Sequence, residues 1–363
     1  LAGALAADRA AIVGGFPDDA PLRSRRTALA GRLEAIAETS DGPAFRLYAA
    51  YFARDPEYAG LTYWSARLRS GTSLRAISAV FALSLELLVG AAGLVSLGHA
   101  AFLGIGAYVT VMATGDGGAA SALWLLPAAM GAAALYAIFV GALSLRTKGV
   151  YFIMVTLAFA QMAYFVFHDT KLGGGSDGIF LYSKPVIQFG KTVLLDLDRK
   201  ADLYYTVLAA LVGTYALLAL INRSRFGHAL AGIRVNEQRM RAAGFATYGY
   251  KLAAFVIAGA LAGLAGFLLA VKDGAVNPEL LSWHESGAVL LMIILGGIGS
   301  LRGAVIGAVA FTLLKELYQS EALLGPLAAH WQLTLGLTII AFVALLPKGL
   351  IGLKARLSGG ANA

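Results

Sequence analysis

The chain has 363 residues, of which 58% are hydrophobic and only 14% are charged. Soluble domains hold about 45–50% apolar and about 25% charged residues, so this composition excludes an ordinary soluble protein and indicates a membrane protein. The net charge of +8 lies largely in loops beside apolar runs. It is read as an orientation signal, and no nucleic-acid partner is expected. The sequence contains no cysteine, which excludes disulfides, thiolate metal sites and cysteine nucleophiles, and no metal site is predicted.

Residues 1–75 differ from the rest of the chain, because they are rich in charge and contain no run of about 20 apolar residues that could span a bilayer. Helical periodicity and turn signals predict three short helices, at 26–38, 45–52 and 63–68. We therefore expect a small soluble helical module. With the motifs Phe-Ala-Arg-Asp-Pro and Gly-Leu-Thr-Tyr-Trp, residues 45–84 resemble a bacterial helical domain of unknown function, which carries no assigned chemistry.

Apolar segments follow from residue 76 to about residue 355 and predict a transmembrane domain, with a cytoplasmic tail at 356–363. Segments near the length of about 20 residues that crosses a bilayer predict an all-α, polytopic membrane protein. It would have eight or nine transmembrane helices in contact with membrane lipids. The predicted spans are 77–97, 100–114, 119–145, 148–168, 202–222, 251–272, 285–298, 303–319 and 331–347. The spans at 100–114 and 285–298 are short and are expected to be broken or tilted.

Basic loops set the orientation of these spans. Between Arg223 and Lys251 there are six Lys or Arg residues against one acid, Glu237. A short basic loop between two spans stays in the cytoplasm, because translocating Lys and Arg is disfavoured. The same orientation places the basic residues at 146–148 and 348–356 in the cytoplasm, as the positive-inside rule requires, and the N-terminal module outside.

The cytoplasmic loop also contains a predicted helix. Residues 234–243 are good helix formers, and a glycine follows them where a helix C-terminus favours glycine. Either the loop is a solvated basic segment that only fixes the topology, or it is a surface that a second protein grips. The residues that would form this surface are Arg234, Asn236, Glu237, Arg241 and Gly244.

The segment 83–108 is predicted to be a helix that is interrupted at residues 93–98 and restarts after His99. Such an interruption is tolerated in a membrane only where protein or a water-filled cavity supplies partners for the backbone. Glu86 and His99 are ionisable groups at or near membrane depth, so they are candidates for a translocation path, together with Ser96. The alternatives are a structural partner for Glu86 and a satisfied hydrogen bond between helices for His99.

Two further segments hold candidate residues of the translocation path. Thr156 and Gln161 are polar positions in an otherwise apolar span, and they either bond to a neighbouring helix or line the path. The run Gly-Gly-Gly-Ser-Asp-Gly at 173–178 lies on the predicted outer side. It is either a simple flexible turn or, with Ser176 and Asp177, a place close to where a substrate enters.

Small residues predict close contacts between helices in the C-terminal half. Gly259, Gly263 and Gly266 lie on one helical face, which lets the backbones of two membrane helices approach each other. The turn Gly-Gly-Ile-Gly-Ser-Leu-Arg-Gly at 296–303 is expected in the cytoplasm.

Several of these segments together resemble a known family. Leu-Ser-Leu-Glu-Leu-Leu-Val-Gly and Gly-His-Ala-Ala-Phe-Leu-Gly-Ile-Gly-Ala-Tyr within 83–108, Lys-Gly-Val-Tyr-Phe-Ile-Met-Val-Thr-Leu at 148–157 and the turn at 296–303 are similar to the branched-chain amino-acid ABC transporter permeases of the LivM type. The resemblance covers about residues 77–355. The basic loop resembles the coupling loop of ABC-importer permeases, which docks on the ATPase subunit. Such permeases usually carry another apolar span before residue 77, where this chain has the N-terminal module.

The resemblance implies a permease subunit of an ABC importer for branched-chain or related hydrophobic amino acids, a multi-pass protein of the bacterial cytoplasmic (inner) membrane. The implied partners are ABC ATPase subunits, a sister permease subunit and a soluble substrate-binding protein. No enzyme activity and no cofactor are expected. The chain has no phosphate-binding Walker A loop, because Gly-Lys-Thr at 190–192 has Pro185 where the leading glycine is needed.

Three alternatives stay open at this point. Related permeases carry urea or short amides. An ATP-independent channel or proton-coupled carrier would use Glu86 and His99 as its titrating pair. A membrane-anchored scaffold would use the N-terminal module as its working part.

Overall fold

The computed structural model describes residues 71–114, 121–181, 183–189, 192–319, 330–346 and 349–352. The predicted N-terminal module, apart from its last five residues, and the predicted tail at 356–363 lie outside these ranges. Those five residues belong to the first described helix, α5, which begins at Gly71 and so starts before the predicted boundary at residue 76.

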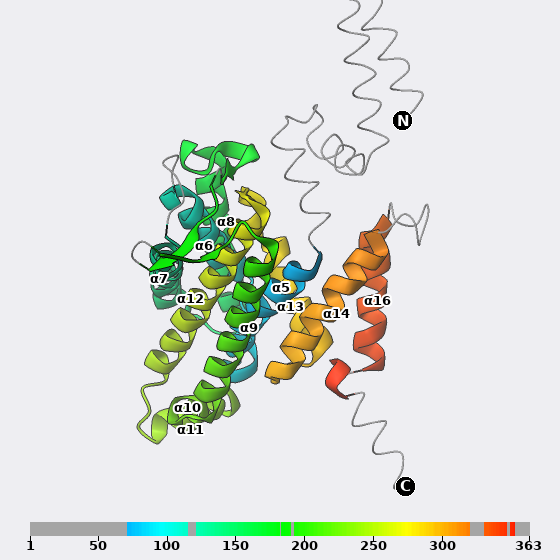
Figure 1. Ribbon diagram of the computed structural model, residues 1–363. Helices are drawn as coiled ribbons and strands as arrows, with labels where there is room; N and C mark the ends of the chain where they lie inside the picture. The colour runs from blue at the N-terminus through cyan, green and yellow to red at the C-terminus, as the bar shows by residue number, and fades with distance from the viewer. Residues whose placement is uncertain are drawn as a thin grey trace, which may run out of the picture. The chain divides into compact units, whose positions relative to one another are not determined.

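Helices dominate the described part of the chain (Figure 1). Most are rich in Ala, Leu, Ile and Phe. A glycine in the left-handed conformation directly follows two of them: Gly93 caps η1 and Gly274 caps α12, each with φ 69°. In chain order the helices are α5 (Gly71–Glu86), the π-helix η1 (Leu87–Ala92), α6 (His99–Thr114), α7 (Ala122–Ser144), α8 (Val150–Asp169), α9 (Lys200–Arg223), α10 (Arg225–Val235), α11 (Glu237–Ala242), α12 (Thr247–Asp273), α13 (Trp283–Gly296), α14 (Leu301–Gln319) and α16 (Trp331–Leu345), with short 3-10 turns η2 (Lys171–Gly173), η3 (Gly175–Asp177) and η4 (Pro278–Leu281).

The polytopic, predominantly helical fold is confirmed, but the predicted number of spans is not. Five helical segments of the described residues are long and apolar enough to cross a membrane alone: α5 with η1, α7, α8, α9 and α12. Helices α13 and α14 pass this test only together and bend by 116° between them, which makes six candidates at most. The predicted spans at 100–114 and 331–347 correspond to α6 and α16, which are apolar but shorter.

Helix α12 is the central helix of the described bundle. It contacts α5, α6 and α7, and 83% of its most apolar stretch is buried, against 17–28% for α7, α8 and α9. Its glycines lie where neighbouring helices come close. A Cβ at Gly259 would lie 2.5 Å from the Cβ of Ala137 in α7, and a Cβ at Gly266 would lie 2.0 Å from the Leu103 carbonyl oxygen in α6. Gly263 also faces α7, so this glycine face packs against two helices at once.

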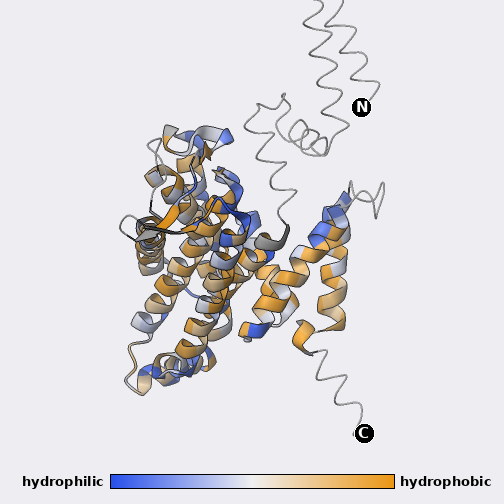
Figure 2. Cartoon of the chain, viewed as in Figure 1, coloured by the Kyte–Doolittle hydropathy of each residue, from blue (hydrophilic) through white to orange (hydrophobic). Residues whose placement is uncertain are grey.

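The two ends of the bundle differ in character. Helices α10 and α11 form a hydrophilic helical hairpin at one end, and short strands lie at the other (Figure 1; Figure 2). Strand β1 (Ile179–Phe180) pairs with β4 (Ala275–Val276), and β2 (Val186–Phe189) pairs with β3 (Thr192–Asp196), both antiparallel. These strands are an exception to the all-α prediction. The sequence around β2 and β3 has apolar runs on either side of Gly-Lys, which is a pattern that favours a tight connection.

The variant Gly266→Ala tests the close approach of α12 to α6. The added methyl group meets the Leu103 carbonyl, so we expect a loss on the order of 1–3 kcal/mol of stability from overpacking. Alanine's better helix propensity offsets about 1 kcal/mol of this loss. Thermal unfolding of the purified protein in detergent measures the difference. In the matched control Gly213→Ala, on α9, no atom lies within 4 Å of the new methyl group, and the unfolding temperature should be kept or raised. Equal unfolding temperatures in the two variants would contradict the packing argument.

Candidate functional site

The hydrophilic end of the bundle is built by two helix caps that the sequence provides. The Ser224 hydroxyl accepts a hydrogen bond from the Gly227 amide and caps α10, and the Asn236 side chain accepts one from the Arg239 amide, at 2.9 Å, and caps α11. The prediction of one helix across 234–243 is therefore wrong at Asn236, which has an extended backbone and separates α10 from α11. Asparagine competes for backbone donors, which favours a cap over a helix interior.

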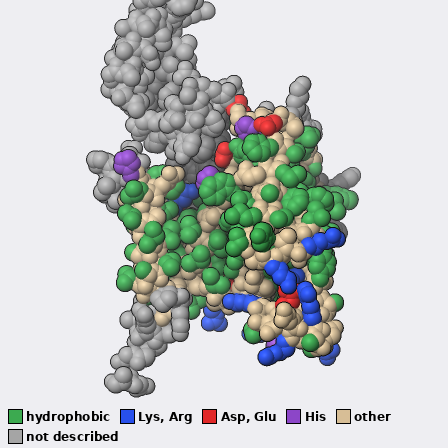
Figure 3. Space-filling model, turned by 180° about the vertical axis from the view of Figure 1, so that it is seen from behind, with side chains coloured by type: hydrophobic (Ala, Val, Ile, Leu, Met, Phe, Trp, Pro, Cys, Tyr) green, Lys and Arg blue, Asp and Glu red, His purple; other side chains and the backbone are tan. Residues whose placement is uncertain are grey.

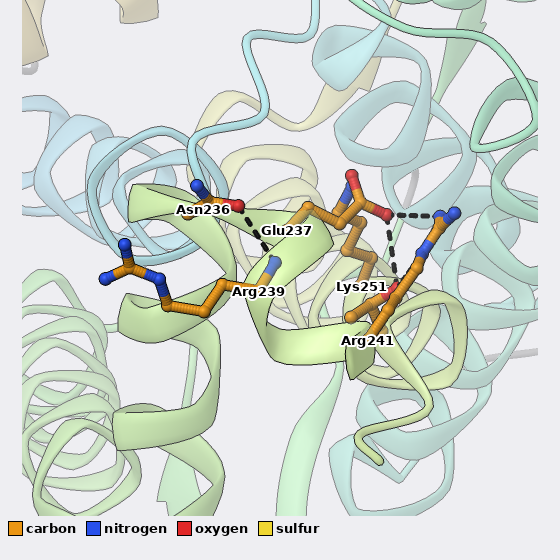
Figure 4. Close-up of polar contacts among 6 residues, drawn as sticks. Asn236, Glu237, Arg239, Arg241 and Lys251 are labelled. Atoms are coloured by element: carbon orange, nitrogen blue, oxygen red, sulfur yellow. Dashed lines mark hydrogen bonds and ion pairs between the residues drawn. The ribbon is translucent and has the colours of Figure 1, made fainter. Parts of the chain in front are cut away.

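Glu237, the acid of this end, is turned toward the bundle (Figure 4). Its carboxylate forms ion pairs with Arg241 and with Lys251 of α12, each at 2.5 Å, and accepts a hydrogen bond from the Thr247 hydroxyl at 3.1 Å. The side chains of Glu237 and Lys251 are only 18% and 14% exposed. This network ties the short helix α11 to the first turns of the central helix.

The surroundings of Glu237 keep it ionised. Desolvation alone would raise the pKa of this carboxyl, but the hydrogen bond and charge of Lys251, with hydrogen bonds from Thr247 and Arg241, together hold the pKa below its ordinary value. The network is therefore complete at neutral pH and weakens only in acid.

With its acid turned inward, the α10–α11 hairpin presents arginines and a few apolar side chains to its surroundings. Figure 3 shows Lys and Arg gathered over this end of the molecule. Val235 is 84% exposed and Phe245 is 40% exposed. The exposed residues that form this surface, called here the arginine face, are Val235, Gln238, Arg239, Arg241 and Phe245. Gly244, also exposed, follows α11 with φ 88°, a conformation that favours glycine. A cationic surface with exposed apolar side chains suits an acidic protein partner.

Glu86 and His99 lie on either side of the break between η1 and α6, and both are buried. The Glu86 carboxylate accepts a hydrogen bond from the Gly299 amide at 2.6 Å. The His99 Nε2 and the Ser84 hydroxyl are 2.8 Å apart, and the imidazole ring packs between Phe81 and Phe102. No hydrogen bond or ion pair joins Glu86 to His99, so the structure does not bring this pair together.

The other candidate path residues lie at two places along α8 and the loop after it. Ser96 and Thr156 are fully buried at the break, where the Thr156 carbonyl lies against Gly98. The Ser96 hydroxyl accepts from the Gly98 amide, and the Thr156 hydroxyl donates to the Ile153 carbonyl. Each hydroxyl therefore forms one hydrogen bond within its own segment.

Gln161 is half-buried one turn further along α8, while Ser176 and Asp177 are exposed at the strand end, on the turn η3. This turn is held in place where the Tyr108 hydroxyl donates to the Gly173 carbonyl at 3.3 Å, and where β1 pairs with β4. Of the candidates, Glu86, Ser96, His99 and Thr156 are thus buried at or beside the break, Gln161 lies further along α8, and Ser176 and Asp177 lie on the exposed turn η3.

Sequence reasoning missed the partners that hold this end together. In the sequence Lys251 is one more basic residue of the loop and Gly299 one more glycine of a turn, so neither can be singled out before the fold is known. Sequence reasoning also missed the ion pair between Lys272 and Asp273 at the strand end of α12, whose side chains are 1% and 3% exposed. Among the described residues, no three His, Asp or Glu side chains are grouped to hold a metal ion.

Comparisons with known proteins identify the family. The family described as "Branched-chain amino acid transport system / permease component" matches residues 68–344. The permease protein LivM of the high-affinity branched-chain amino acid transport system of Escherichia coli is 30% identical over 312 residues, which are 79% of this chain and 72% of LivM. LivM of Salmonella typhimurium is 30% identical over 75% of this chain and 67% of its own length. Escherichia coli LivH is 24% identical over 80% of this chain and 96% of its own length. No solved structure matches the chain significantly.

The variant Glu237→Gln tests whether this carboxylate stabilises the hydrophilic end. We expect a loss of about 1 kcal/mol at neutral pH, kept small because Arg241 is 53% exposed and water screens the pair. The folded-state pKa is lowered, so the contribution is fully present above the ordinary carboxyl pKa of about 4.3 and disappears as the pH falls through the lower folded-state value.

Thermal unfolding in detergent at neutral pH and at progressively lower pH measures this difference. Glu285→Gln is the matched control, because no ion pair joins Glu285 in the part of the chain that the structure describes. If the difference in unfolding temperature between Glu237→Gln and the unchanged protein stays constant with pH, this result would argue against the ion-pair network.

Proposed function

From the premise that the chain belongs to the family of branched-chain amino acid transport system permease components, we propose that it is the membrane subunit of an importer driven by separate ATPase subunits. The chain is a multi-pass transport permease and not an enzyme. The observation that carries the proposal is the arginine face. It is a cationic, partly apolar surface on two short helices that project from one end of the membrane bundle.

The α10–α11 hairpin is rigid enough to transmit movement from a docked ATPase subunit. A loop that only fixed the topology would need its positive charges and nothing more. Here both helices are capped, and the single acid ties α11 to Lys251. A push on the arginine face is therefore passed to a structured element instead of being absorbed by a flexible loop.

The central position of α12 gives that push a route into the membrane. Helix α12 begins at Thr247, next to the ion-pair network, and packs along α6 and α7 through Gly259, Gly263 and Gly266. Helix α6 starts at the break. Nucleotide-driven closure of the ATPase subunits would tilt α12 and carry α6 with it, and this movement would open and close the path.

Substrate, partners and location follow the relatives. Two different permease proteins of branched-chain amino acid transport systems, LivM and LivH, are both similar to this chain, which favours a pair of related permeases side by side. The proposed substrates are branched-chain or related hydrophobic amino acids, delivered by a soluble substrate-binding protein outside the bacterial cytoplasmic membrane. The sister permease and ATPase subunits would complete the assembly.

The charge reversal Arg239→Glu tests docking on the arginine face. The Arg239 side chain is exposed and extends away from the Glu237 network (Figure 4), so its replacement should leave the fold intact. Like charges against an acidic partner surface cost several kcal/mol, so we expect at least a tenfold loss of ATP-dependent leucine uptake by vesicles holding the complete transporter. ATPase activity stimulated by the loaded binding protein should fall in parallel.

Lys148→Glu is the matched control, because Lys148 is an exposed basic residue on another predicted cytoplasmic loop. Leucine uptake by the transporter with Lys148→Glu should stay close to that of the unchanged transporter. Uptake by Arg239→Glu equal to the control would rule out this docking surface. Uptake by the unchanged protein that survives ATP depletion and collapses with an uncoupler would instead support a proton-coupled carrier.

A further inference from the structure

The α10–α11 hairpin has a second connection to the membrane bundle, separate from α12. Arg234, near the end of α10, reaches η1, and its Nη1 donates a hydrogen bond to the Gly90 carbonyl. The side-chain stem of Arg234 crosses Gly93, where a Cβ would lie 2.9 Å from the arginine Cγ. Gly93 also has φ 69°, so glycine is favoured there by both the backbone and the arginine.

The Gly90 carbonyl accepts this bond because the helix stops there. Residues 89–92 are the last four of η1, and the final carbonyls of a helix have no partner within the helix. An unpaired carbonyl in a membrane is costly unless protein or water satisfies it. Arg234 supplies the donor from a residue 144 positions away, so the end of η1 is stabilised by a helix that lies outside the spans.

Glu86 extends the same junction to a third segment. Its Oε1 lies directly over Gly90, where a Cβ would be 2.0 Å away, and accepts from the Gly299 amide. Gly299 belongs to the connection between α13 and α14, the pair that bends by 116°. The guanidinium of Arg234 lies close to Gly299 as well, since a Cβ there would be 3.7 Å from Nη1. The end of α10, the break after η1 and the bend between α13 and α14 therefore meet at one point.

We infer that Arg234 and Glu86 are positioning residues that pass movement of the α10–α11 hairpin to the helix break and to the α13–α14 bend. Arg234 carries the movement to the Gly90 carbonyl, and Glu86 carries it on to Gly299. Glu86 is thus part of the force-transmitting junction and not of a solute-binding or proton-carrying site. This inference rests on the proposed function, since it concerns how the docked hairpin acts on the spans.

The route through Arg234 differs physically from the route through Lys251. The Lys251 route moves α12 as a packed rod, and its effect on α6 comes from van der Waals contact along the glycine face. The Arg234 route acts through two hydrogen bonds at a point where the helix is already open. Transport would require α10 to move η1 and α11 to move α12 at the same time. Loss of the Arg234 bond would then stop transport, while the docked ATPase subunits continue to hydrolyse ATP.

The variant Arg234→Met tests this directly in the complete transporter in vesicles. Methionine keeps an unbranched stem over Gly93 and removes every donor. We expect assembly with the ATPase subunits and ATP hydrolysis to be retained, while the number of leucine molecules imported per ATP hydrolysed falls at least fivefold. This number of leucine molecules per ATP is called here the import ratio. Arg234→Lys keeps a cationic donor group, so its import ratio should lie between those of Arg234→Met and the unchanged protein. Arg225→Ala, an exposed arginine at the start of the same helix, is the matched control and should keep the ratio unchanged.

A second measurement reports movement at the break itself. The chain has no cysteine, so Leu94→Cys introduces a single labelling site there. Its labelling rate should change when ATP is added to the otherwise unchanged transporter, and this change should be lost with Arg234→Met. Glu86→Leu removes the acceptor for Gly299 and should lower the import ratio as Arg234→Met does, so it carries the test if Arg234→Met does not assemble.

The outcomes separate the two proposals. Normal ATP-dependent uptake in the unchanged protein, together with a normal import ratio in Arg234→Met or, if that variant does not assemble, in Glu86→Leu, would overturn the junction and leave the importer function standing. Absence of ATP-dependent uptake in the unchanged transporter would overturn the importer function. A lowered ratio with retained hydrolysis and a lost labelling change supports the junction.

Discussion

A helix that stops inside a membrane leaves amide and carbonyl groups without water to bond to, and the protein has to supply every partner. The break at residues 93–98 meets this constraint with side chains. The Ser96 hydroxyl accepts from the Gly98 amide, and the Ser286 hydroxyl of α13 accepts from the Ala100 amide in the first turn of α6, at 2.9 Å. Arg234 donates to the last turn before the break. The break is therefore stable only when α10 and α13 are packed in place.

The same constraint explains how a rigid bundle can respond to its hydrophilic end. Elsewhere in the bundle, close packing of Ala and Gly fixes the helices against one another, as α12 fixes α6 and α7. At the break the restraint is a small number of hydrogen bonds, each of which a modest displacement can lengthen. The part of the movement that Arg234 passes on is thus concentrated at the break, whereas α12 moves as a packed rod.

The local features of this fold are those that the sequence predicted well. The break and the helical segments of the basic loop depend on neighbouring residues, and glycine and serine at 93–98 were enough to place the break. Long-range partners depend on the completed fold: 144 residues separate Arg234 from Gly90, 186 separate Ser286 from Ala100, and 213 separate Glu86 from Gly299. No periodicity or spacing in the chain encodes those pairs.

The differences from the sequence predictions have equally physical causes. The eight or nine predicted spans stay a prediction, because length and composition do not show the 116° bend between α13 and α14 or decide whether the shorter helices α6 and α16 cross the membrane. Helix propensity gave one helix over 234–243 because it averages over Asn236, whose side chain caps α11 instead of continuing α10. The strands at 179–196 and 275–276 were missed because each is only two to five residues long.

The position of Glu86 shows why an intramembrane carboxylate does not by itself identify a transport path. Such a group is costly in a bilayer, and function is the usual reason for keeping it. Here the Gly299 amide and the nearby Arg234 charge offset part of that cost, and both come from segments that meet at the carboxylate. A group that carried protons would need to exchange with water or with a second titrating group, and His99 is bonded elsewhere. The cost of burying Glu86 is consistent with a junction that has to form in one geometry, because a charge without its partners would be unstable in any other.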